Sequence, residues 1–130
     1  MGSELSTGTR ASMVVLLADD ELVVRSLARS VLTRAGYKVL DAVDGEQALE
    51  VSRQYTGPID LLLTDVKMPK MDGLQLSAQI SRERPGIKIL LMSGRPSGEL
   101  IVLGEKMPFL RKPFLPDVLC ERLNSLLARE

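Results

Sequence analysis

The chain has 130 residues, which is enough for one domain with its own hydrophobic core. Its 17 basic and 17 acidic residues cancel, so no overall charge favours nucleic acid or an anionic membrane as a partner. One cysteine excludes an internal disulfide, and the absence of histidine excludes imidazole metal ligands, a Ser-His-Asp triad and an internal phosphohistidine.

The start of the chain is predicted to be a tail. Residues 1–12 contain almost no large apolar side chain, so we expect a flexible tail or linker there and one domain over residues 13–130. No apolar run approaches the roughly 20 residues of a membrane span, and the N-terminus lacks the layout of a signal peptide. We therefore expect a cytoplasmic protein with no membrane insertion.

Strands and helices are predicted to alternate along the domain. Short apolar runs predict five strands, at residues 13–18, 38–42, 61–65, 87–92 and 109–110. Helical spacing predicts a helix after each strand, at about residues 22–35, 45–55, 73–84, 95–104 and 116–127. This alternation predicts an α/β, flavodoxin-like three-layer sandwich with a five-stranded parallel sheet in the order 2-1-3-4-5 and five helices.

The helix ends and buried faces can also be predicted. The first helix ends at Gly36, and six apolar residues share its predicted buried face: Val24, Leu27, Ala28, Val31, Leu32 and Ala35. Asp44 and Gln47 are typical of a capping box at the second helix, whereas Leu115 leaves the last helix without a good N-cap.

Acidic, hydroxyl and basic side chains follow the predicted strands. Asp19 and Asp20 follow the first strand, Asp65 ends the third, Ser93 follows the fourth and Lys112 follows the fifth. Because the carboxyl ends of parallel strands meet at one sheet edge, we expect these side chains to share a crevice. Crowded carboxylates need a cation, and hard oxygen ligands suit Mg²⁺.

This combination suits phosphoryl chemistry. An aspartate can act as a nucleophile and form an acyl phosphate when a metal and a fixed cation neutralise the phosphoryl oxygens. Lys112 supplies the fixed cation, and the Ser93 hydroxyl can donate to another phosphoryl oxygen.

From Met13 onwards the chain resembles the receiver domains of bacterial response regulators. Four motifs carry the resemblance, in this order: Asp19-Asp20, Thr64-Asp65-Val66-Lys67-Met68-Pro69 with Asp72-Gly73, Ser93-Gly94, and Lys112-Pro113-Phe114. The resemblance implies that Asp65 is the phosphoacceptor and that Asp20, Asp65 and the main-chain carbonyl of Lys67 bind Mg²⁺, with Asp19 acting through a water.

The resemblance also implies a switch and a donor. Ser93 and Phe109 occupy the family's switch positions, and Lys112 precedes a proline that is typically cis. The phosphoryl group would come from a phosphohistidine on a histidine kinase or histidine phosphotransfer domain, and the output would be a partner-binding face. Such a domain accepts a phosphoryl group rather than acting as an enzyme, beyond slow self-dephosphorylation.

A finer resemblance concerns the parent protein. Residues 89–94 and 108–114 look most like receivers fused to the C-terminus of hybrid sensor histidine kinases, which would make this chain part of a membrane-associated kinase. The alternatives are a stand-alone single-domain response regulator and a docking module that works without phosphorylation. Lys67 and Arg95 flank the site and are predicted to slow loss of the phosphoryl group.

Other classes of function compete with this interpretation. Asp19 and Asp20 also fit the N-cap of the first helix. A flavin binder of this fold would need aromatic loops, yet the chain has two Tyr, two Phe and no Trp. An aspartyl-phosphate phosphatase would carry a second Asp where Lys67 stands.

Overall fold

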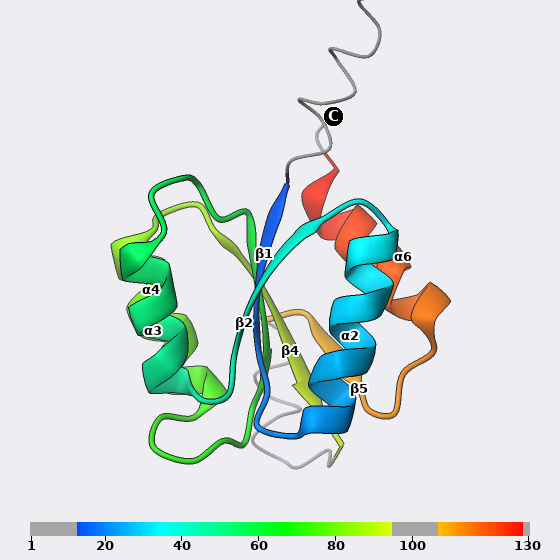
Figure 1. Cartoon of the computed structure of the whole chain (residues 1–130), viewed down its shortest axis with the longest axis horizontal. Coiled ribbons are helices and arrows are strands. Elements are labelled where there is room, and N and C mark those ends of the chain that lie inside the picture. The colour runs from blue at the N-terminus through cyan, green and yellow to red at the C-terminus, as the bar shows by residue number, and fades with distance from the viewer. Residues whose placement is uncertain (1–12, 95–106, 129–130) are drawn as a thin grey trace, which may run out of the picture.

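Five short strands form one parallel sheet in the computed structural model, which describes residues 13–94 and 107–128. The strands are β1 (Val14–Ala18), β2 (Lys38–Ala42), β3 (Leu61–Asp65), β4 (Lys88–Ser93) and β5 (Phe109–Arg111). Their order is β2-β1-β3-β4-β5, which confirms the predicted topology (Figure 1). The predicted tail and the helix predicted over residues 95–104 lie outside the described residues.

The helices cover both faces of this sheet. α2 (Leu22–Arg34) and α6 (Pro116–Leu127) lie on one face, and α3 (Gly45–Gln54) and α4 (Gly73–Glu83) lie on the other (Figure 1). Among the described residues, these are four of the five helices that the sequence predicts. None of them is long and apolar enough to cross a membrane.

The central strands β1 and β3 are completely buried because both of their faces are covered. Successive side chains of a strand point to opposite faces, so each strand contributes to two separate cores. Leu61 and Leu63 of β3 pack in the core under α2 and α6, whereas Leu62 packs in the core under α3 and α4. The register places Leu63 beside Leu17 of β1 and Leu90 of β4.

The predicted buried face of α2 is partly wrong. Ala28 and Leu32 are fully buried, but Leu27 is 44% exposed and Ala35 is exposed. Ala28 and Leu32 stand four residues apart and so form one narrow stripe, whereas Leu27 is turned about 100° away from Ala28 around the helix axis. Ala35 lies at the C-cap, one residue beyond the end of the helix.

The helix ends agree with the sequence prediction better than the buried face of α2 does. Gly36 adopts a φ of 100° after α2, as a helix-ending glycine does. The Asp44 side chain accepts from the Gln47 main-chain N–H, and Leu115, the N-cap residue of α6, provides no side-chain cap, as predicted. The Gln47 amide oxygen accepts from Val43 rather than from Asp44, so the reciprocal bond of a capping box is displaced by one residue.

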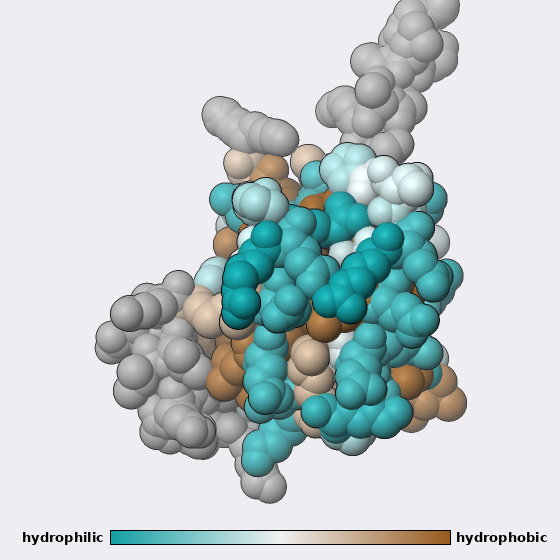
Figure 2. All heavy atoms as spheres, turned by 90° about the vertical axis from the view of Figure 1, so that its left-hand side faces the viewer, coloured by the Kyte–Doolittle hydropathy of each residue, from teal (hydrophilic) through white to brown (hydrophobic). Residues whose placement is uncertain are grey.

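Two further helix ends are held by side-chain contacts: the one at Asp72 agrees with its prediction as a cap or turn residue, and the one at Arg84 was not predicted. Asp72 and Gln75 form a complete capping box at the start of α4. The Arg84 guanidinium caps the far end of α3, donating to the main-chain oxygens of Ser52, Tyr55 and Gly57. The outer face over α3 and α4 is otherwise mainly hydrophilic (Figure 2).

Candidate functional site

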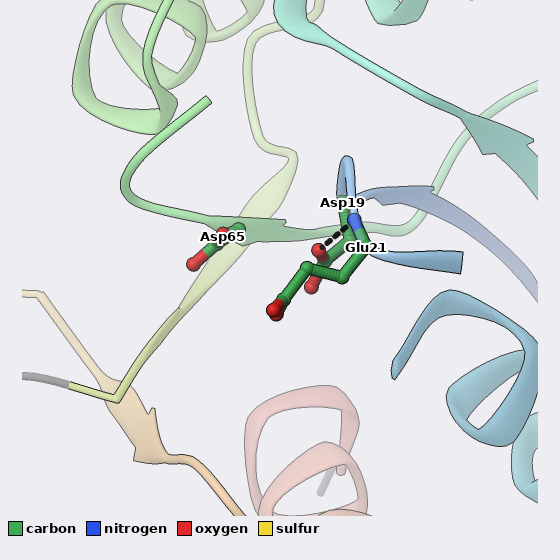
Figure 3. A group of neighbouring side chains, drawn as sticks. All are labelled: Asp19, Glu21 and Asp65. Carbon is green, nitrogen blue, oxygen red and sulfur yellow. Dashed lines mark hydrogen bonds between the residues drawn. The ribbon is translucent and has the colours of Figure 1, made fainter. Parts of the chain in front are cut away.

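Three acidic side chains gather where β1 and β3 end. Asp19 follows β1 directly, Asp65 is the last residue of β3, and Glu21 begins the turn into α2. The parallel pairing of Ala18 with Thr64 brings the two strand ends level. Carboxylate oxygens of Asp19, Glu21 and Asp65 all lie within 4.8 Å of one another (Figure 3). The predicted convergence of Asp19 and Asp65 is therefore confirmed.

A lysine lies among these acids. Lys112 follows β5, and its Nζ lies 3.1 Å from Asp19 Oδ2, 3.0 Å from Glu21 Oε1 and 3.4 Å from Asp65 Oδ1. Its main-chain N–H donates to the Ser93 carbonyl at 2.9 Å, which continues the β4–β5 ladder to this point. The Lys112-Pro113 peptide bond is cis, as the family pattern implies.

Asp19 is held from several sides and is fully buried. Its Oδ1 accepts from the Glu21 main-chain N–H at 2.9 Å, and its carbonyl accepts from the Arg25 guanidinium at 2.8 Å. Because the N-cap of α2 is Glu21, helix capping does not account for Asp19 or Asp20. The capping alternative is therefore wrong.

Asp65 is held by the loop that follows it. The Gly73 N–H donates to the Val66 carbonyl at 2.8 Å, which folds this loop back against the strand end. A Cβ on Gly73 would lie 2.2 Å from the Asp65 carbonyl oxygen, so only glycine fits this approach. The Thr64 hydroxyl also donates to the Asp65 carbonyl at 2.9 Å.

Among the described residues the site holds three acids and one cation, and burial and neighbouring charges shift the pKa values of Asp65, Asp19 and Lys112. Burial and the neighbouring charge of Asp19 raise the pKa of Asp65 to about 6. Burial also raises the pKa of Asp19. Burial acts to lower the pKa of Lys112, but its hydrogen bond to Glu21 and the charges of Asp65 and Asp19 outweigh burial and raise that pKa. The site would thus accept further positive charge.

The remaining predicted residues lie around this centre. Ser93 ends β4 and is buried, and Phe109 begins β5 and is partly buried. Asp20 and Lys67 are exposed, and Asp20 is not one of the three clustered acids. The roles predicted for these four residues stay predictions. Arg95 lies outside the described residues.

Glu21 is the residue of this site that the sequence analysis missed. It completes an Asp-Asp-Glu run directly after β1, which is the one signal that pointed to it. Nothing in that run showed that its side chain would reach a lysine 91 positions later.

Comparisons with known proteins decide the family. Residues 15–124 match the model of the response regulator receiver domain. The chain belongs to this family. The receiver is thus a signalling domain of two-component systems, with the flavodoxin-like fold that the sequence predicted.

Similar proteins include both regulators and kinases. The receiver is 36% identical over 120 residues to the response regulator GtcR of Aneurinibacillus migulanus, covering 91% of this chain and 49% of GtcR. It is 32% identical over 130 residues to the sensor kinase CckA of Brucella abortus, covering 98% of this chain and 14% of CckA. The chain therefore spans half or less of the length of these relatives.

A solved structure agrees. The crystal structure of the receiver domain from the hybrid histidine kinase CckA is 36% identical, covers 88% of this chain and 99% of the other, and has a TM-score of 0.77.

Proposed function

We propose that this receiver takes a phosphoryl group from a phosphohistidine onto Asp65. The position of Asp65, at a strand end and 3.4 Å from the Lys112 ammonium, is the observation that supports this role. An Asp65 carboxylate oxygen attacks the phosphorus, the bond from phosphorus to the imidazole nitrogen breaks, and the imidazole leaves with its electron pair. The donor lies outside these 130 residues because they contain no histidine.

The site fits Mg²⁺. Its donors are hard carboxylate oxygens, and one lysine does not balance the three clustered acids. Asp65, Asp20 and the Lys67 main-chain carbonyl would hold the ion, with Asp19 acting through a water. A bound Mg²⁺ supplies neutralising charge for the phosphoryl oxygens. Lys112 then binds a phosphoryl oxygen as a fixed point charge, and Ser93 donates its hydroxyl to another.

An exposed apolar surface lies on the side of the sheet that carries α2 and α6. Leu22 and Val23 at the start of α2 are 66% and 78% exposed, and Leu115 just before α6 is 68% exposed. Both helices follow strands that end at the sheet edge carrying Asp65, and α2 begins at that edge (Figure 1). A protein that presents its phosphohistidine beside an apolar face would cover these side chains. We therefore place the donor here rather than on the hydrophilic face of Figure 2.

The output is a change of packing on the β5 side. The phosphoryl group adds about −1.5 to −2 charges and new acceptor oxygens at Asp65. Ser93 moves towards it, Phe109 turns inward, and the face that includes β5 and α6 changes its partners as a population shift. Ser93→Ala and Phe109→Ala are each expected to make partner binding independent of phosphorylation. Unchanged dependence in both variants would contradict the switch.

The parent protein is proposed to be a hybrid sensor histidine kinase, which would make the receiver cytoplasmic. The 36% identity to the receiver of CckA supports this origin. GtcR is equally identical but about twice as long as this chain, so it does not favour the alternative of a stand-alone single-domain response regulator. A docking module that works without phosphorylation would not need the clustered acids and lysine.

The decisive experiment detects phosphorylation by mass spectrometry of the intact protein. The chain is incubated with Mg²⁺ and a small acyl phosphate, and its intact mass is measured. We expect one added phosphoryl group on the wild type, none on Asp65→Asn, and one on the matched control Asp117→Asn, whose side chain is exposed on α6. No adduct on the wild type would overturn the proposed phosphoacceptor role.

A further inference from the structure

Glu21 closes a ring of hydrogen bonds around the site. Its main-chain N–H donates to Asp19 Oδ1 at 2.9 Å, and its side-chain Oε1 accepts from Lys112 Nζ at 3.0 Å. Lys112 completes the ring by donating to Asp19 Oδ2 at 3.1 Å. The Glu21 carboxylate lies on the same side as those of Asp19 and Asp65 in Figure 3.

The side chain of Glu21 has no helix-capping role. Glu21 is the N-cap residue of α2, yet its side chain makes no cap hydrogen bond to that helix. N-cap side chains usually satisfy the first main-chain N–H groups of a helix. Here the carboxylate reaches Lys112 instead, so its contact concerns the site and not the helix.

The Lys112 ammonium lies among three carboxylates and donates hydrogen bonds to two of them, those of Asp19 and Glu21. A lysine ammonium carries three donors, and in the part of the chain that the structure describes, Asp19, Glu21 and Asp65 are the carboxylates within 3.4 Å of it. These acids differ in exposure: the side chain of Glu21 is 60% exposed, that of Asp65 11%, and Asp19 is fully buried. Exchanging the Glu21 contact for another acceptor therefore costs less free energy than exchanging either of the other two contacts.

We propose that Glu21 is a positioning residue that occupies one N–H of Lys112 in the unphosphorylated site and gives it up to a phosphoryl oxygen. This inference rests on the proposed phosphoacceptor function of Asp65. The incoming phosphoryl group brings up to three acceptor oxygens, whereas two of the three donors of the ammonium are already hydrogen-bonded to Asp19 and Glu21, and the ammonium is also paired with Asp65. Glu21 thus competes with the phosphoryl group and holds back phosphorylation until the donor has displaced it.

Two variants of Glu21 separate the effect of its side-chain length from the effect of its charge. Glu21→Gln keeps the length and loses the charge, and Glu21→Asp keeps the charge but is one methylene shorter. At saturating Mg²⁺ we expect both to be phosphorylated by a small acyl phosphate about two- to fivefold faster than the wild type, the size of effect that one exposed ion pair produces. The matched control Glu50→Gln, exposed on α3, should keep the wild-type rate.

Three other outcomes would overturn the proposal. A wild-type rate in Glu21→Asp with a raised rate in Glu21→Gln would show a general charge effect and overturn the proposal. A slower rate in both variants would overturn it too, because Glu21 would then assist phosphorylation. No adduct on the wild type overturns the phosphoacceptor function, and this inference falls with it.

A double-mutant cycle tests whether Glu21 acts through Lys112. If it does, Glu21→Gln has no effect on the rate in a Lys112→Ala background, whereas independent effects would add and overturn the proposal. A second readout avoids phosphorylation: in the metal-free chain, Glu21→Gln and Glu21→Asp should both shift the NMR signal of the Lys112 ε-methylene group. An unchanged signal in both variants would show that the contact is absent in solution and would overturn the proposal.

Discussion

Asp65 is a buried carboxyl group that folding makes harder to ionise. Its pKa rises from 3.8 to about 6, so the folded state binds the proton more tightly than the unfolded state between these pH values. The free energy of unfolding therefore falls as pH rises from about 4 to 6, and this loss persists at neutral pH. The protein keeps a nucleophile here at a cost to its own stability.

Asp65→Asn should stabilise the metal-free chain at pH 7 by roughly 2 kcal/mol, because asparagine cannot ionise. The gain should disappear at pH 4, where the wild-type carboxyl is already protonated in the folded state. Urea unfolding with a chelator present, at pH 4 and at pH 7, checks this. A difference that stays constant across pH would mean that ionisation is not its cause. Asp117→Asn is the control.

The geometry of the site also depends on Gly73, because one added carbon atom there would collide with the end of β3. The Cβ that Gly73→Ala adds would lie 2.2 Å from the Asp65 carbonyl oxygen. We expect a loss of about 2 kcal/mol in the free energy of unfolding and slower phosphorylation, since the end of β3 must shift. Gly94→Ala is a suitable control for stability, because its nearest atoms would lie 3.9 Å away. Equal stability of the two variants would contradict this account.

At the scale of elements, α3 depends on a residue that lies after α4. The last carbonyls of a helix have no partner within it, and Arg84 supplies one to Ser52 and to the following Tyr55. Arg84 also donates to the Ser52 hydroxyl and to the Gly57 carbonyl. One guanidinium thus fixes both the end of α3 and the turn towards β3.

Arg84→Met should therefore lower the free energy of unfolding by about 2–3 kcal/mol, the usual value for lost hydrogen bonds to a charged group. Arg82→Met, which removes an exposed guanidinium two residues earlier, should change it little. Thermal unfolding checks the size, and faster amide exchange confined to the end of α3 and the following turn would identify the cause. Exchange that is unchanged there would show that Arg84 is not the cap.

How far apart two contacting residues lie in the sequence explains which features the sequence could predict. Apolar runs such as Leu61–Leu63 and the short connections between elements were enough for the strands, their order and the convergence of Asp19, Asp65 and Lys112. Glu21 and Arg84 escaped prediction because their partners lie 91 and 27–32 positions away in sequence. The exposed Leu27 shows a third limit, since helical spacing marks an apolar face but not its width.

At the scale of the whole molecule, a protein donor and a small donor should respond differently to the exposed apolar surface. Val23→Glu places a charge on that surface and leaves the clustered acids and Lys112 in place. We expect phosphoryl transfer from a phosphorylated histidine kinase that phosphorylates the wild type to slow about tenfold, while the rate with a small acyl phosphate stays unchanged. Equal slowing with both donors would place the effect in the site itself.

The Lys112 contacts also determine when the site can form during synthesis. Asp19 and Glu21 leave the ribosome before Lys112, which lies 93 and 91 positions after them. A nascent chain that has completed β3 already carries both Asp19 and Asp65 but still lacks the cation between them. The site therefore comes into being only when the two ends of the domain have met, and a chain that stops before β5 would be unable to take part in signalling.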